Sequence, residues 1–363
     1  MLIVDAHEDL AWNILTFGRD YTRSAQETRE VERGTETPLH NGDTLLGWPD
    51  YQRGRVAIVF ATLFSAPERR KLGEWDIQTY RNAGEAHANY MKQVDAYHRL
   101  VDEHPDKFQL VLSQPDLETV LSAWEEPGED GHPVGLVILM EGAEGVRSSE
   151  ELEEWWQAGV RLIGPSWAGT RFSGGTREPG PLTKEGYALL EGMADLGFTL
   201  DISHMDEQAA LQALDYYPGR VIASHANAVR LLKDVQSNRF LTDPVIYRLL
   251  EREGIIGIVP YNRFLLWGWT PADGRHLVTL EHAVAQIDTI CQMAGDARRV
   301  GIGSDYDGGF GLQMAPSGVD TIADLQKLVP LLFEKGYTEN DIAAIMGGNW
   351  LSLLRETMPG KKE

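Results

Sequence analysis

The 363-residue sequence has very little cysteine, no long apolar run and comparatively few basic residues. Its single cysteine, Cys291, excludes an intrachain disulfide, and we expect it to pack as a small apolar residue in the apolar-periodic stretch 280–294. No segment approaches the ~18 uninterrupted apolar residues of a membrane span. The first residues lack a basic region, and Asp5 and His7 interrupt their apolar run. We therefore expect a soluble, cytoplasmic protein that neither carries a secretion signal nor binds a membrane.

Lysine and arginine number 33 against 55 aspartates and glutamates, which gives a formal net charge of −22 at pH 7. This excess of negative charge disfavours binding to a phosphate backbone, so nucleic acid is not an expected partner. The apolar fraction of 42% over this length is sufficient for a large core, which excludes a disordered chain and a small crosslinked scaffold. Because no composition break or low-complexity linker divides the chain, we expect one domain spanning residues 1–363.

Short β-branched or aliphatic runs alternate with segments of helical periodicity, a pattern typical of parallel strands buried on both faces. Eight such strand-then-helix units predict an α/β fold of the (β/α)8, TIM-type barrel class, with an open doubly wound sheet as the alternative. A further run, 108–112, is expected as a short edge strand before the third barrel strand. The predicted barrel strands are 2–6, 56–64, 135–140, 160–165, 198–203, 220–224, 254–259 and 300–304, and the clearest helices are 83–103, 184–196, 243–252 and 280–294.

Long polar stretches follow several of these strands, at 18–54, 66–78, 262–276 and 306–318. In a barrel they would rise from the catalytic face as lids and walls. The acidic, Gly- and Pro-containing stretch 125–133 precedes a strand instead, so it is predicted to be an ordinary surface connection.

Residues of the types that bind metals stand where five of the predicted strands end. The carboxyl ends of parallel barrel strands converge on one face, so these side chains are expected to meet although they are far apart in sequence. Histidine nitrogens and carboxylate oxygens suit zinc, and one carboxylate can bridge two ions. The residues are His7, Asp9, Glu141, His204, His225 and Asp305.

Each of these residues also has an ordinary structural interpretation. A lone histidine after a strand is usually a structural or capping residue, Glu141 could open a helix, and Asp305 could cap a turn. The joint placement favours a metal site, and the His-x-Asp spacing puts His7 and Asp9 on the same side of an extended chain. Asp201 is a candidate partner that orients a ligand. The other histidines, at 40, 87, 98, 104, 132, 276 and 282, are expected in surface, capping or packing positions.

Six motifs in sequence resemble, in the same order, those of the renal (membrane) dipeptidase family, peptidase family M19. The resemblance extends from Ile3 to about Arg355. The motifs are DAHEDL (5–10), MEG (140–142), LDISH (200–204), ASH (223–225), GIGSDYDG (301–308) and GGNW (347–350).

The resemblance implies an amidohydrolase-like barrel that holds two zinc ions, with Glu141 bridging them. His7 and Asp9 would complete the first ion's ligands, and His204 and His225 the second's. It also implies hydrolysis of an amide by a hydroxide that bridges the metals.

Two further residues receive roles from the resemblance. Asp305 matches the residue that takes up and returns the proton of the attacking water. Arg239 matches the arginine that binds the terminal carboxylate of the substrate, a task for which a planar bidentate donor is suited.

The sequence departs from the family pattern in two places. Trp167 stands where similar dipeptidases carry a histidine that supports the substrate carbonyl and the oxyanion. That contact is then lost or supplied by another group such as Arg171, and activity on dipeptides would be weak or redirected. Glu8 also replaces the asparagine that usually separates the two ligands of the first motif.

The sequence thus indicates a zinc-dependent metallodipeptidase that cleaves a small amide, such as a dipeptide, next to a free carboxylate. One alternative is another amidohydrolase reaction, either deacylation of an N-acyl amino acid or opening of a lactam or lactone. The other is a metal-binding barrel that has lost catalysis and serves as a binding protein. Apolar surface on the barrel helices would also permit a homodimer.

Overall fold

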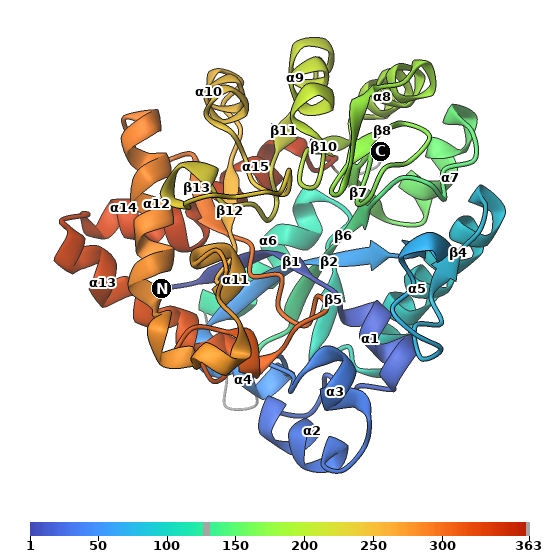
Figure 1. Cartoon of the computed structure of the whole chain (residues 1–363). Coiled ribbons are helices and arrows are strands. Elements are labelled where there is room, and N and C mark those ends of the chain that lie inside the picture. Colours follow the sequence, from blue (N-terminus) through green and yellow to red (C-terminus); the bar gives the residue numbers. More distant parts are fainter. Residues whose placement is uncertain (126–130, 361–363) are drawn as a thin grey trace.

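The computed structural model describes residues 1–125 and 131–360. Most of the predicted surface connection 125–133 lies outside these described residues. In the described part, eight parallel strands surround a central axis, with helices outside them (Figure 1). The barrel strands are β1 (Ile3–Glu8), β2 (Val56–Phe64), β6 (Val134–Glu141), β7 (Val160–Gly164), β10 (Thr199–Asp201), β11 (Val221–Ile222), β12 (Ile256–Ile258) and β13 (Val300–Ile302).

The strand order is β11-β10-β7-β6-β2-β1-β13-β12, and each neighbouring pair is parallel. A parallel bridge between Ala223 and Ile256 joins the two ends of this order. There the Ala223 amide donates to the Ile255 carbonyl at 2.9 Å, and the Gly257 amide donates to Ala223 at 2.8 Å. The predicted (β/α)8 barrel is therefore confirmed, and the open-sheet alternative is wrong.

The extra predicted strand is also present as β5 (Phe108–Leu110), which pairs in parallel with the outer part of β6. Every residue of β6 is buried, because the strand faces the barrel interior on one side and helices on the other. Burial on both faces explains why the barrel strands are apolar runs in the sequence without polar alternation. Two smaller sheets lie beside the barrel: β3 (Ala66–Pro67) with β4 (Thr79–Tyr80), and β8 (Ser173–Gly175) with β9 (Glu178–Leu182).

The four clearest predicted helices all form, and a capping side chain marks the start of one of them. Thr183 accepts a hydrogen bond from the Gly186 amide at the start of its helix, and Cys291 is buried as predicted. Among the described residues, no helix combines the length and the apolar character needed to cross a membrane. The helices that follow or flank the barrel strands are α1 (Leu10–Phe17), α5 (Ala83–Glu103), α6 (Gln114–Glu125), α7 (Leu152–Gln157), α8 (Lys184–Leu196), α9 (Glu207–Tyr216), α10 (Asp243–Glu251), α11 (Asn262–Leu265), α12 (Leu280–Ala294), α13 (Leu328–Lys335), α14 (Glu339–Ala343) and α15 (Asn349–Thr357).

The polar stretch 18–54 contains three short helices, α2 (Ala25–Glu32), α3 (Thr37–Asn41) and α4 (Trp48–Gly54). It is fastened to the turn after β13 by the buried carboxylate of Asp307. That carboxylate accepts hydrogen bonds from Arg19 at 2.9 Å, from the Tyr21 hydroxyl at 2.9 Å and from the Thr44 hydroxyl at 2.5 Å. The stretch thus forms a fixed wall beside the catalytic end of the barrel.

Candidate metal centre

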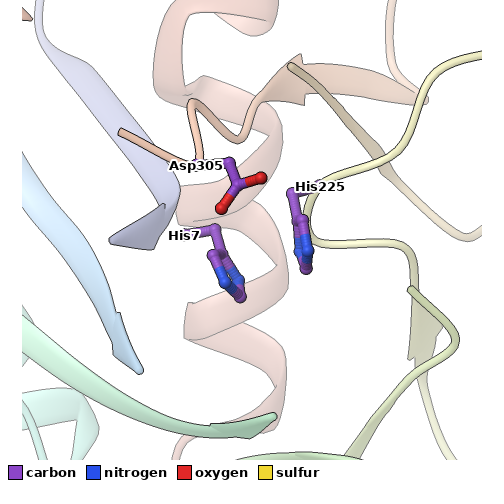
Figure 2. A group of neighbouring side chains, drawn as sticks. All are labelled: His7, His225 and Asp305. Carbon is purple, nitrogen blue, oxygen red and sulfur yellow. The ribbon is translucent and has the colours of Figure 1, made fainter. Parts of the chain in front are cut away.

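The structure brings the six predicted metal-type residues together at the carboxyl ends of their strands. Three overlapping groups result, and in each group one ligand atom per residue lies within 4.8 Å of the others. Figure 2 shows one group, with the His7 and His225 rings side by side and the Asp305 carboxylate next to them, each from a different segment. The groups are His7, Asp9 and Glu141; Glu141, His204 and His225; and His7, His225 and Asp305.

Glu141, the last residue of β6, lies at the centre of the cluster. Its Oε1 is 3.0 Å from His204 Nε2 and 3.3 Å from His225 Nε2. Its Oε2 is 3.7 Å from His7 Nε2. One carboxylate thus faces three imidazoles from three other strand ends.

The first pair of ligands depends on an irregularity at the end of β1. The register of β1 against β2 shifts between Asp5 and Glu8, and His7 and Asp9 both face the cluster. Thr62 donates a hydrogen bond to Asp9 Oδ1 at 2.5 Å. Glu8, between His7 and Asp9, points away from the cluster, and its carboxyl accepts a hydrogen bond from the Tyr51 hydroxyl. Burial and the neighbouring Asp5 raise the pKa of Glu8 well above its usual range.

Hydroxyl groups fix the orientation of His225 and His204. The Ser224 hydroxyl donates to Asp201 at 2.5 Å, so its oxygen accepts from His225 Nδ1 at 2.8 Å. The Thr176 hydroxyl contacts His204 Nδ1 at 2.9 Å and the His204 carbonyl at 3.4 Å. The Nε2 lone pair of His225 is therefore left toward Glu141, the Nε2 atom of His204 faces the same carboxylate, and Asp201 has the orienting position that the sequence suggested.

The close approach of these nitrogen atoms suits a shared cation. His204 Nε2 and His225 Nε2 are 2.9 Å apart, and both face Glu141 Oε1. The His7 Nε2 atom is buried and has no hydrogen-bond partner. Three imidazole nitrogens directed at shared carboxylate oxygens are a suitable donor set for zinc or a similar divalent ion.

The electrostatics of the cluster are dominated by its buried charges. Burial lowers the pKa of His7, but Glu141, Asp9 and Asp305 outweigh it and raise the value to about 9. Burial and the Arg239 guanidinium lower the pKa of His204 to about 4. Burial raises the pKa of Asp9 to about 7 against the opposing effect of His7. The pKa of Glu141 falls well below its usual range, because the attraction of His7 and His204 exceeds its burial penalty.

Asp305 lies in a tight turn after β13, and its left-handed backbone, with φ of 59°, is uncommon for a residue with a side chain. Its amide donates to the carbonyl of His7 at 3.1 Å. A Cβ on Gly308 would lie 2.1 Å from Asp305 Oδ1 and 2.8 Å from Asp9 Oδ2, so glycine is needed for this close approach. Burial and the nearby carboxylates raise the pKa of Asp305 well above its usual range, despite the opposing charge of His7.

Arg239 is buried beside the cluster. It donates to the carbonyl of His225 at 2.8 Å, and its guanidinium carbon is 5.1 Å from the centre of the Phe264 ring. Its Nε atom is buried without a hydrogen-bond partner. Burial lowers the pKa of Arg239. The structure therefore places a guanidinium with unused hydrogen-bonding capacity next to the predicted ligands.

Trp167 and Arg171 lie in the segment after β7 but in different surroundings. The Trp167 ring is 6.1 Å from the His204 ring and 5.1 Å from the Phe64 ring, so it borders the cluster. Arg171 donates to Glu144 at 2.9 Å and pairs with Glu185 at 3.0 Å. It also lines a separate cavity of 490 Å³. The contacts of Arg171 are thus to these neighbours, and Trp167 is the residue beside the metal ligands.

Sequence reasoning did not identify several residues that position the cluster. Thr62 and Thr176 contact ligands but come from parts of the chain distant in sequence from the residues they support. Ser224 directly precedes a predicted ligand, and that adjacency is the one signal that could have indicated its role. Among the other histidines, His87 bonds to the Gly145 carbonyl, in line with the predicted packing and capping positions.

A comparison with known families finds a match over nearly the whole chain. The family described as membrane dipeptidase (peptidase family M19) matches residues 1–362. The chain belongs to this family. As a dipeptidase of peptidase family M19, it carries the candidate metal ligands His7, Glu141, His204 and His225 at the strand ends of its barrel.

Individual relatives are distant but cover most of the chain. An uncharacterized dipeptidase of Schizosaccharomyces pombe is 26% identical over 98% of this chain and 80% of its own length. A metallopeptidase of Rhodobacter sphaeroides, liganded with a phosphinate mimic of the dipeptide L-Ala-D-Ala, has a TM-score of 0.77 at 22% identity, covering 98% and 99% of the two chains. An amidohydrolase of Pseudomonas aeruginosa has a TM-score of 0.68 at 18% identity, covering 86% and 92%. The fold is therefore an amidohydrolase-like barrel.

Proposed function

We propose that this M19 family member is a zinc-dependent hydrolase of dipeptides or closely related small amides that end in a free carboxylate. Its two ions would be held by His7, Asp9 and Glu141 on one side and by Glu141, His204 and His225 on the other. The observation that carries the proposal is the convergence of three histidine Nε2 atoms on the single carboxylate of Glu141. The dipeptide mimic bound to the Rhodobacter sphaeroides relative supports the substrate class.

The residues around the cluster divide the remaining tasks. Arg239 would bind the terminal carboxylate of the substrate, because its buried guanidinium has a free Nε and no competing carboxylate partner. Asp305 would accept a proton from the attacking water and return it to the departing amine. Two zinc ions bound there would supply Lewis acidity and lower the pKa of a water molecule. Burial of all these groups keeps bulk water from weakening their electrostatic interactions.

The proposal is tested by measuring the metal content of the purified protein together with turnover on dipeptides and N-acyl amino acids. We expect about two equivalents of divalent metal and hydrolysis of at least some dipeptides. A chelator should abolish this hydrolysis, and added zinc should restore it. Two metals with turnover on N-acyl amino acids alone would replace the dipeptidase assignment with a deacylase, and a metal-free, inactive protein would contradict the metal site itself.

Replacing Trp167 with histidine is expected to raise dipeptide turnover. The indole of Trp167 offers only one N–H donor and lacks the imidazole that the family histidine places beside the substrate carbonyl. A donor that stabilises the oxyanion contributes about 10²–10³ in rate. Because Trp167 also contacts Phe64, part of this gain will be offset by lost packing. Steady-state kinetics of Trp167→His and Trp167→Phe, at equal metal content, measure the effect. A fall in turnover for the histidine variant would instead give Trp167 a role of its own in substrate binding.

A further inference from the structure

Three arginines around the mouth of the metal centre have no carboxylate partner, in a protein with a formal net charge of −22. They are Arg177, Arg239 and Arg263, and no ion pair within residues 1–125 and 131–360 involves any of them. Arg239 is buried, whereas Arg177 and Arg263 are exposed. Guanidiniums without a carboxylate partner beside a candidate substrate site favour a ligand of negative charge.

The main chain of Arg177 is fixed next to the metal ligands. Arg177 lies at the tip of the hairpin between β8 and β9, directly after Thr176, whose hydroxyl contacts His204 Nδ1 at 2.9 Å. The Arg177 amide donates to Asn238 Oδ1 at 2.9 Å, and Asn238 directly precedes Arg239. Its left-handed backbone, with φ of 65°, is typical of such a hairpin turn. The hairpin tip is therefore held between a metal ligand and the segment that carries Arg239.

Arg263 lies in a second segment beside Arg239. It belongs to α11, directly before Phe264, whose ring lies 5.1 Å from the guanidinium of Arg239. Tyr261, two residues earlier, has its ring centre 4.8 Å from that of Phe264. Arg239 is thus flanked by the hairpin tip on one side and by α11 on the other.

The pKa of the Tyr261 hydroxyl is affected both by two of these arginines and by Asp305. Burial raises the pKa of Tyr261, whereas the charges of Arg263 and Arg177 lower it. The negative charge of Asp305 raises the pKa of the same hydroxyl. Arg177, Arg263 and Asp305 therefore all lie within electrostatic range of one side chain at the mouth.

We propose that Arg177 and Arg263 form a specificity site for an acidic side chain on the C-terminal residue of the substrate, beside the terminal carboxylate bound by Arg239. The inference rests on the proposed function, because that function places the terminal carboxylate at Arg239. A C-terminal aspartate or glutamate carries two carboxylates on one residue, and the three guanidiniums provide separate partners for them. Charge-assisted hydrogen bonds from planar guanidiniums suit this recognition. The local positive charge also offsets the repulsion that the acidic surface exerts on such a substrate.

The test compares dipeptides that differ only in the charge of the second side chain, namely Ala-Glu with Ala-Gln and Ala-Asp with Ala-Asn, each with an L or a D second residue. For the wild-type enzyme, kcat/KM should favour the acidic member by about tenfold, mostly through KM. In the double variant Arg177→Gln/Arg263→Gln the acidic and neutral dipeptides should be cleaved with about equal kcat/KM, and Arg177→Lys should retain part of the preference. Added salt should weaken the preference in the wild type. Arg147→Gln, which removes an exposed arginine paired with Glu151, is the matched control.

Two further measurements separate this proposal from the proposed function. Glu-Ala and Gln-Ala should be cleaved without an acidic preference, because the charge then lies on the other residue. Thermal stabilisation of the protein by Ala-Glu should exceed that by Ala-Gln, a readout independent of turnover. Equal kinetics and equal stabilisation for the acidic and neutral members, or a preference that survives in the double variant, would overturn the specificity site. Absence of hydrolysis for every dipeptide, with stronger binding of the acidic ones retained, would overturn the proposed function alone.

Discussion

Replacement of Glu141 with glutamine is expected to lower turnover by about 10³-fold or more and to reduce the bound metal. The wild-type carboxylate faces His204 and His225 through one oxygen and His7 through the other. An amide keeps the shape of the side chain, but it carries no charge and has one acceptor oxygen where the carboxylate has two. It therefore cannot bridge two cations. Metal analysis of the purified variant and steady-state kinetics on a cleaved dipeptide measure the two effects.

The matched control is Glu144→Gln, which changes a glutamate just after β6 that pairs with Arg171 instead of facing the imidazoles. It should retain the wild-type metal content. If Glu141→Gln kept both its metal and its turnover, the central role of Glu141 in the proposed site would be wrong.

Replacement of Asp305 with asparagine is expected to lower kcat by about 10²–10⁴-fold while the metal content stays near that of the wild type. Asparagine preserves the hydrogen-bonding shape but cannot take up the proton that the proposed mechanism assigns to this carboxylate. The tight turn at Gly308 should accept the change, because the two side chains are nearly equal in volume. Kinetics and metal analysis of the same preparation are the required measurements.

The metal content is informative because Asp305 also groups geometrically with His7 and His225. Should Asp305→Asn lose about one equivalent of metal, Asp305 would be a ligand and the proton would need another carrier. Asp320→Asn, at an exposed carboxylate near Arg275, is a suitable control and should leave both quantities unchanged.

Much of the barrel could be predicted because its physics is local. Parallel strands covered on both faces must be apolar, so β2 and β6 appear in the sequence as uninterrupted runs. The side chain at the end of such a run lies at the carboxyl end of the barrel whatever the rest of the chain does, which is why the sequence alone predicts that Glu141 and His225 meet. That the whole chain is one domain stays a prediction, as do the individual roles of the site residues.

The parts that could not be predicted depend on contacts between distant segments. The orientation of His204 depends on Thr176, and the side chain of Arg171 is directed by Glu144 and Glu185. The sequence suggested Arg171 as a substitute for the missing histidine, because only its proximity along the chain to Trp167 was visible. Trp167 and Arg171 lie in the irregular segment between β7 and β8, whose packing depends on partners elsewhere, so no local pattern reveals where each side chain points.

The Asp307 contacts have a consequence for the order in which the protein is made. Arg19 and Thr44 lie 288 and 263 residues before the carboxylate they bind, and β1 needs β13 as its second neighbour. On the ribosome, the side chains of Arg19 and Thr44 must therefore wait for nearly the whole chain before they contact Asp307. The emerging chain carries an unfinished strand edge until that point, which is the period in which assistance by chaperones matters most. The Asp307 contacts and the pairing of β1 with β13 can therefore form only late, once the end of the chain is available.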